Sequence, residues 1–173
     1  YARFETSMGN FTVRLRPDLA PKTVANFVGL AEGTIDTITG RPGKSKPYYN
    51  GLTFHRIIAG FMIQAGGVVR GDSVVGVGYT IPDEFDAKLR FNRAGIMGMA
   101  NAGGPHSAGS QFFITVAPYP SLNGKYTPFG EVVSGLDVVK KISTVKTTGA
   151  RGTPPNRPLS PVVIKTVTIE RVQ

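Results

Sequence analysis

Residues 54–64 read FHRIIAGFMIQ, an apolar run interrupted by a few strongly polar side chains. Arg56 is the most informative of these, because a guanidinium group is always charged and is rarely buried without a partner. An arginine between His55 and two isoleucines, on an expected strand, therefore indicates the wall of a cleft. Gln64, at the end of the same run, has the same interpretation.

Two further segments later in the chain repeat this pattern. Residues 99–103 read MANAG, and residues 109–114 read GSQFFI, which places Gln111 directly before two phenylalanines. A pocket that is mostly apolar, with a few fixed polar groups, suits a small ligand or a peptide. The segments together therefore indicate such a site.

The composition indicates one β-rich domain. The 173 residues are 40% hydrophobic, which allows a single core, and 22 glycines and 13 prolines favour many turns over a helical bundle. No apolar run approaches the roughly 18 residues that span a membrane, so no membrane partner is expected. The absence of cysteine excludes disulfides, thiol catalysis and cysteine-ligated metals. We treat residues 1–173 as one domain.

The net charge of +9 raises the question of a nucleic-acid partner. The lysines and arginines are spread along expected loops and strands, however, and they are not interleaved with aromatic residues as a base-stacking surface requires. A solvated basic surface explains the charge better, so no nucleic-acid partner is expected. The start at Tyr1 and a pI of about 10.0 favour a periplasmic or exported protein, with a cytoplasmic one left open.

Periodicity predicts short strands and two helices. Alternation at 11–15 indicates a half-buried strand, which pairs through a turn at 7–10 with residues 2–6. Pro21 and apolar residues at helical spacing predict a helix that ends at Gly33. A second helix is expected at 136–143, and further strands at 52–65 with a break at 59–60, 96–100, 111–116, 127–133 and 162–172. Loops are expected at 34–48, 66–78 and 153–158. Without a repeating strand–helix–strand rhythm, this pattern predicts a mainly β fold, a closed antiparallel barrel.

Several motifs, in order along the chain, resemble those of the cyclophilins, the peptidyl-prolyl cis-trans isomerases. They are the segments quoted above together with PKTVANF at 21–27, YNG at 49–51, LNGK at 122–125 and FGEV at 129–132. The resemblance covers nearly the whole chain and implies a closed eight-stranded barrel capped by two α-helices. It also implies catalysis of X-Pro bond rotation in polypeptides, in assistance of protein folding. No cofactor or metal is expected, because no bond is broken.

The resemblance assigns candidate roles to individual residues. Arg56 is the candidate catalytic group, because a permanently charged donor in a water-poor cleft can bond the proline nitrogen of a twisted amide. Phe61 and Met62 are candidates for the proline pocket. They are adjacent, so both can line it only if the backbone is irregular, and Gly60 allows this. The other candidate substrate-binding residues are Gln64, Ala100, Asn101, Gln111, Phe113, Ser121, Leu122 and Tyr126.

Each assignment has a structural alternative. The apolar pocket candidates could be ordinary core, and Arg56 could form a structural ion pair at the mouth of the barrel. Gln64 and Gln111 could bridge backbone groups, and Asn101 could be a turn residue that bonds its own backbone. These alternatives stay open at the level of sequence.

The two histidines suggest metal or hydrolase chemistry, which the spacing does not support. His55 and His106 lie far apart, with no third ligand at metal spacing. Ser110 follows a glycine but lacks the second glycine of a hydrolase nucleophile elbow. We expect His55 to pack against the barrel and His106 to be exposed in a loop.

Departures from the family pattern bear on specificity. Well-studied eukaryotic cyclophilins carry tryptophan where Ser121 stands, so any cyclosporin binding is expected to be weak. A histidine of the pocket rim aligns with Tyr126, and residues 65–70 replace an acidic, glycine-rich turn, which is expected to alter the residues accepted before proline. The expected partners are proline-containing peptides and unfolded or nascent proteins, bound by a monomer. The alternative function is a proline-peptide-binding or chaperone module with little turnover.

Overall fold

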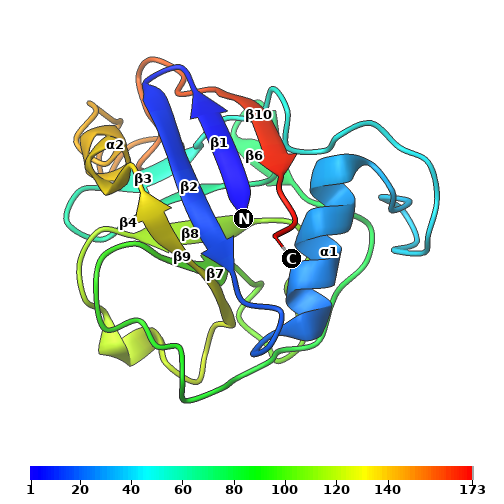
Figure 1. Cartoon of the computed structure of the whole chain (residues 1–173). Helices are drawn as coiled ribbons and strands as arrows, with labels where there is room; N and C mark the ends of the chain where they lie inside the picture. Colours follow the sequence, from blue (N-terminus) through cyan, green and yellow to red (C-terminus); the bar gives the residue numbers. More distant parts are fainter. Residues whose placement is uncertain (173) are drawn as a thin grey trace.

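Eight antiparallel strands form a curved sheet with helices at its margins (Figure 1). The computed structural model describes residues 1–172. The spatial order of the strands is β10-β1-β2-β9-β7-β8-β4-β3. Their bounds are β1 Ala2–Thr6, β2 Gly9–Leu15, β3 Arg56–Ile58, β4 Met62–Ala65, β7 Ile96–Met99, β8 Phe112–Thr115, β9 Pro128–Ser134 and β10 Ile164–Ile169. The predicted mainly β architecture is confirmed.

The first hairpin shows how alternation builds the barrel. β1 and β2 pair from Ala2↔Val13 to Thr6↔Gly9, and every second side chain of β1 is buried. Phe4 and Phe11 lie opposite each other in this register, and their rings stack with centroids 4.6 Å apart. The period of two therefore turns an alternating sequence into one buried and one solvated face.

Two α-helices, α1 (Pro21–Glu32) and α2 (Leu136–Ile142), lie on opposite sides of the barrel (Figure 1). Pro21 occupies the first turn of α1, where its missing N–H costs no hydrogen bond. The Glu84 carboxylate accepts hydrogen bonds from the Thr23 backbone N–H (2.6 Å) and hydroxyl (2.8 Å). The helix ends at Gly33 in a left-handed conformation (φ 75°), where a Cβ would lie 2.4 Å from the Ser45 carbonyl oxygen. Both predicted helices are confirmed.

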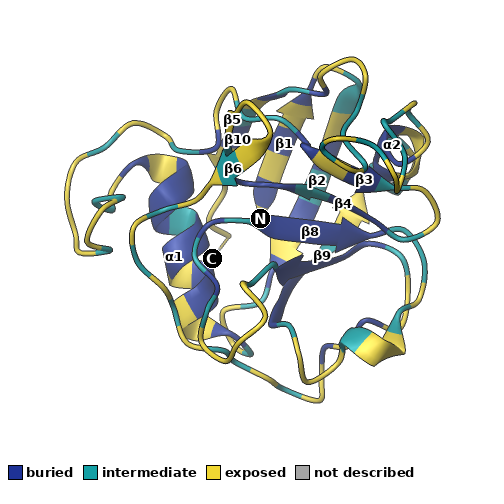
Figure 2. Ribbon diagram, turned by 180° about the vertical axis from the view of Figure 1, so that it is seen from behind, coloured by how far each residue is buried: buried dark blue, intermediate teal, exposed yellow. Residues whose placement is uncertain are grey.

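The core inside the barrel is strongly aromatic. Phe112 of β8 is fully buried, and its ring meets those of Phe4, Phe27 and Tyr49 edge-on with centroids 5.4–5.8 Å apart. Such edge-to-face pairs add to the free energy of area burial. This cluster fixes α1 on the sheet and holds β8, which carries part of the site, in place. Figure 2 shows β8 and the inner face of α1 in the buried colour.

Three sequence expectations need correction. Residues 66–78 were expected as a loop, but β5 (Val68–Arg70) and β6 (Ser73–Val75) pair there as a separate hairpin. The glycines of this segment obscured two β-branched runs around a Gly-Asp turn, which is a hairpin signal. The closing strand covers 164–169 rather than 162–172. Finally, "closed" was too strong, because β3 is short and, within residues 1–172, no strand ladder joins β3 to β10. The two edges of the sheet meet near the isolated bridge Thr53↔Val163 and its flanking hydrogen bonds.

The helices are short in relation to a bilayer. Within residues 1–172, no helix combines the length and the apolar character that crossing a membrane requires.

Candidate active site

One row of residues across the barrel wall carries the polar groups of the site. The register pairs Arg56 of β3 with Gln64 of β4, Gln64 with Phe113 of β8, and Phe113 with Gly98 of β7. Directly paired residues project to the same face of a sheet. Residues that are far apart in sequence therefore meet because of strand register alone.

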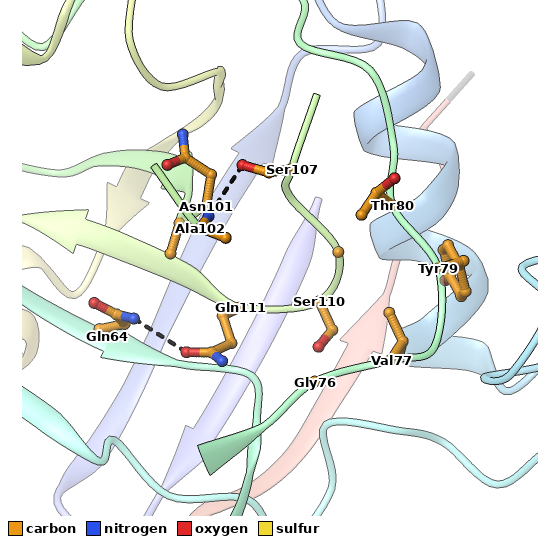
Figure 3. Close-up of a pocket in the computed structure, with 12 residues that line it drawn as sticks. Gln64, Gly76, Val77, Tyr79, Thr80, Asn101, Ala102, Ser107, Ser110 and Gln111 are labelled. Carbon is orange, nitrogen blue, oxygen red and sulfur yellow. Dashed lines mark hydrogen bonds between the residues drawn. The ribbon is translucent and has the colours of Figure 1, made fainter. Parts of the chain in front are cut away.

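A chain of side-chain hydrogen bonds orients the guanidinium of Arg56. Its Nη1 donates to Gln64 Oε1 at 3.1 Å. Gln64 Nε2 in turn donates to Gln111 Oε1, also at 3.1 Å, and Figure 3 shows this second bond. Arg56 is exposed, while both glutamines are partly buried. One end of the guanidinium is thus held by the barrel, and its remaining N–H groups can face a ligand.

An apolar pocket of about 170 Å³ lies beside this guanidinium. Phe113, only 5% exposed, forms its floor, and the Phe113 ring stacks on Phe91 (5.4 Å) and meets Tyr126 edge-on (5.5 Å). Nine of the predicted site residues line this pocket: Arg56, Phe61, Met62, Gln64, Ala100, Asn101, Phe113, Leu122 and Tyr126.

The irregular backbone expected at Gly60 is present. Gly60 has a positive φ of 75°, and the Phe61 N–H donates to the Ile58 carbonyl at 3.0 Å in a tight turn between β3 and β4. Phe61 therefore lies before the regular strand that Met62 begins. This turn allows two adjacent side chains to line the same pocket.

A second pocket of about 250 Å³ adjoins the first and shares Gln64, Ala100 and Asn101 with it. Gln111 lines this second pocket rather than the first. Figure 3 shows Gln64, Gln111 and Ser110 on one side, with the segment from Gly76 through Val77 to Tyr79 running past them. The two pockets together form a continuous lining of the kind that an extended ligand needs.

Two predicted site residues have additional or different surroundings. Ser121 is exposed on the 3₁₀ turn Pro120–Leu122 and lines neither pocket, whereas Leu122 of the same turn does. The turn alternative for Asn101 is present, because Asn101 Oδ1 accepts from the Gly103 N–H at 3.0 Å. Asn101 Nδ2 also donates to the Lys125 carbonyl at 3.0 Å. Asn101 therefore lines both pockets while bracing two loops.

The ionisable groups near the site do not form a metal centre or a triad. Within residues 1–172, no group of three histidine, aspartate, glutamate or cysteine side chains is placed to hold a metal. Ser110 Oγ donates to the Gly66 carbonyl at 2.7 Å, a structural role. His106 is exposed, as expected. His55 is buried, also as expected, and its burial together with the charge of Arg157 lowers its pKa from 6.5 to about 4.

Sequence reasoning missed the residues that support the pocket from behind. A Cβ on Gly98 would lie 2.7 Å from the Phe91 ring and 2.9 Å from the Phe113 ring, so only glycine allows these rings to pack there. Tyr119 packs on Phe61 with centroids 4.3 Å apart. An isolated glycine inside an apolar strand signals such a close approach, and Gly98 carried that signal.

Comparisons with known proteins agree with this geometry. The profile of the family described as "Cyclophilin type peptidyl-prolyl cis-trans isomerase/CLD" matches residues 1–169. Peptidyl-prolyl cis-trans isomerase A of Mycobacterium tuberculosis is 47% identical over 172 residues, which cover 97% of this chain and 91% of that protein. Peptidyl-prolyl cis-trans isomerase B of Streptomyces anulatus is 44% identical, with 98% and 96% covered.

Solved structures are similar over the same length. A cyclophilin-type isomerase of Cryptosporidium parvum superposes with a TM-score of 0.79 at 28% identity, with 99% of this chain and 98% of that chain covered. A second crystal structure of that isomerase, determined in the presence of the dipeptide Ala-Pro, has the same TM-score at 27% identity, with 99% of each chain covered.

Proposed function

The chain belongs to the cyclophilin-type peptidyl-prolyl cis-trans isomerases, and from this premise we propose that Arg56 and the apolar pocket beside it are its catalytic centre. The observation that carries the proposal is the hydrogen bond from Arg56 to Gln64 at the edge of the Phe113 pocket. A permanently charged donor is thereby presented, in a fixed orientation, beside an apolar space.

The reaction is rotation about the X-Pro peptide bond. Its barrier of about 18–20 kcal/mol arises from amide resonance, which places the nitrogen lone pair in the π system. When the bond twists, the lone pair returns to the proline nitrogen, which can then accept a hydrogen bond. An enzyme accelerates the rotation only if it binds this twisted amide more tightly than either planar form.

Arg56 supplies such differential binding. An N–H of its guanidinium donates to the proline nitrogen of the twisted amide, and in the planar amide this nitrogen is a poor acceptor. Because Gln64 holds the opposite edge of the guanidinium, little reorientation is needed at the transition state. The donor is charged at every physiological pH, so the step requires no proton transfer.

The apolar pocket positions the proline ring. Phe113, Met62 and Leu122 offer contacts without polar groups, and the half-buried rings of Phe61 and Tyr126 complete the lining. Binding the ring there leaves the X side of the bond free to rotate. The substrates are proline-containing peptides and unfolded or nascent proteins, in keeping with the Ala-Pro dipeptide used with the Cryptosporidium structure. Cyclosporin binding is weak, because exposed Ser121 stands where well-studied eukaryotic cyclophilins carry tryptophan and has no indole ring to contact the drug.

The test compares Arg56→Ala and Arg56→Lys with the wild-type chain on a short X-Pro peptide, with cis-trans exchange measured by NMR. Loss of a preorganised transition-state donor lowers kcat/KM by about 10²–10³-fold, and we expect this for Arg56→Ala. Lysine keeps the charge but cannot bond Gln64 and the substrate with one planar group, so partial activity is expected. Arg14→Ala, an exposed arginine on β2, is the matched control and keeps full activity.

Two outcomes would contradict the proposal. Full activity of Arg56→Ala would remove Arg56 from the mechanism. Peptide binding by the wild-type chain without enhanced cis-trans exchange would favour the alternative, a proline-binding or chaperone module with little turnover.

A further inference from the structure

The hairpin formed by β5 and β6 carries four valines, of which Val69 and Val75 are exposed and Val68 and Val74 are half-buried. Val68 pairs with Val75, and Val69 pairs with Val74, in a two-stranded sheet separate from the barrel. Neither of the two hydrophobic core clusters of the described chain includes any of the four. Val69 is 39% and Val75 46% exposed, and Figure 2 shows the hairpin without the buried colour.

The hairpin is also unpaired along its outer edges. Within residues 1–172, the only backbone–backbone hydrogen bonds of 68–75 are those between β5 and β6. The outer N–H and C=O groups of both strands are therefore free to pair with an added strand. The strands have only three residues each, and Arg70 is exposed at the turn, features that limit pairing with other folded molecules.

The hairpin begins and ends at the second pocket of the active site. A Cβ on Gly67, just before β5, would lie 3.1 Å from Gln111 Nε2. Gly76, just after β6, lines that pocket, and a Cβ there would lie 3.2 Å from Ser110 Oγ (Figure 3). At its tip, the Gly71 carbonyl accepts a hydrogen bond from Arg157 Nη1. The hairpin is thus a braced extension of the substrate-binding surface.

We propose that this hairpin is a docking strand for the substrate chain itself, selective for extended apolar segments that flank the proline. The inference rests on the proposed function, because it places the reacting proline in the Phe113 pocket. A chain leaving that pocket enters the second pocket, which shares Gln64, Ala100 and Asn101, and then reaches Gly76 and the hairpin. There it adds a β-strand to a free edge, and its apolar side chains cover the valines.

This arrangement defines a substrate class. Main-chain pairing requires an extended segment, and the exposed valines favour β-branched or other apolar side chains in it. Such segments are exposed in unfolded proteins and buried in folded ones. The hairpin therefore directs the enzyme to prolines a few residues from a future β-strand or core segment, and it prolongs contact with the unfolded chain.

The test uses peptides with one common Ala-Pro centre and different flanks. One series carries Val-Thr-Val before the centre, a second carries it after, and a third carries Gly-Ser-Gly on both sides. We expect the wild-type KM to be about tenfold lower in one of the two valine series than in the Gly-Ser series, with kcat unchanged. N-methylation of the flanking amides, which prevents strand pairing, is expected to abolish the gain.

Protein variants locate the effect. Val69→Ser with Val75→Ser is expected to raise KM for the favoured valine peptide to that of the Gly-Ser peptide, while the Gly-Ser peptide is turned over as by the wild type. Val133→Ser, which alters a valine of 51% exposure on β9, is the matched control and keeps the tenfold preference. Both changes lie on exposed side chains, and circular dichroism verifies the fold.

The outcomes separate this inference from the proposed function. Three results would overturn the docking strand while leaving isomerisation intact. The wild type could have equal KM for all three peptide series, its preference for valine flanks could survive N-methylation, or the double variant could keep that preference. Absence of turnover of the Gly-Ser peptide by the wild type would instead overturn the proposed function.

Discussion

Replacing the buried histidine His55 with glutamine removes a specific pH dependence of stability. His55 is only 8% exposed, and its Nδ1 has no hydrogen-bond partner among the residues that the structure describes. Burial and the positive charge of Arg157 both disfavour an imidazolium, so the pKa of His55 falls from 6.5 to about 4 in the folded state. In the unfolded chain the imidazole is solvated and titrates near its ordinary value of about 6.5.

The sign and size of the effect follow from proton linkage. Above about pH 6.5 the imidazole is neutral in both states and contributes no slope. Below it the unfolded state binds a proton that the folded state does not, so the free energy of unfolding falls by about 1.4 kcal/mol for each pH unit. The fall ends near pH 4, where folded His55 also becomes protonated, and totals about 3 kcal/mol.

Urea unfolding followed by circular dichroism at pH 7, 6 and 5 measures this dependence. This pH range lies above the region in which carboxylates such as Glu32 titrate. The Arg171 guanidinium lowers the pKa of Glu32 below its ordinary value. Between pH 7 and 5 we expect the wild type to lose about 2 kcal/mol that His55→Gln does not lose. The substitution also shifts overall stability, so the quantity compared between the two chains is the slope of the free energy of unfolding against pH. Parallel pH dependences of the two chains would refute the account of a buried, neutral His55.

Two further substitutions test the site and the core. Gln64→Leu removes the acceptor for Arg56 and the donor to Gln111. We expect kcat for a short X-Pro peptide to fall about tenfold, while KM changes by less than about twofold. An unchanged kcat would show that Arg56 needs no such partner. Phe112→Ala empties the centre of the aromatic cluster, so urea unfolding should show a loss of about 3–5 kcal/mol, and a loss below about 1 kcal/mol would contradict the packing described.

The strands and helices were largely predictable because their signals are local. Alternation over residues 11–15 and the proline-to-glycine span of 21–33 reflect the periods of a strand and a helix, which need no knowledge of distant partners. The 66–78 segment failed for a related reason. Its glycines and its valine pairs are competing local signals, and only pairing between β5 and β6 decided in favour of the hairpin.

The candidate site was predictable in part. Arg56 stood out as a charge in an apolar run, and the family motifs identified most of the pocket lining. Ser121 was named with Leu122, yet only Leu122 lines the pocket, because side-chain directions on a 3₁₀ turn depend on how the turn docks. Phe91 escaped notice because a supporting contact from behind a pocket leaves no motif of its own. Gly98 did carry a signal, as an isolated glycine in an apolar strand, but it was not interpreted as a close approach.

The sequence by itself determined the periodic elements, the absence of cysteine chemistry, and a permanently charged donor among apolar residues. These properties belong to side chains and to short-range geometry, so they are present before the chain folds. Only the tertiary structure decided that Arg56, Gln64 and Phe113 share one row, that Gln111 lines the neighbouring pocket, and that four valines stay outside the core. Strand register and long-range packing set those neighbours, and both are properties of the assembled barrel rather than of any segment.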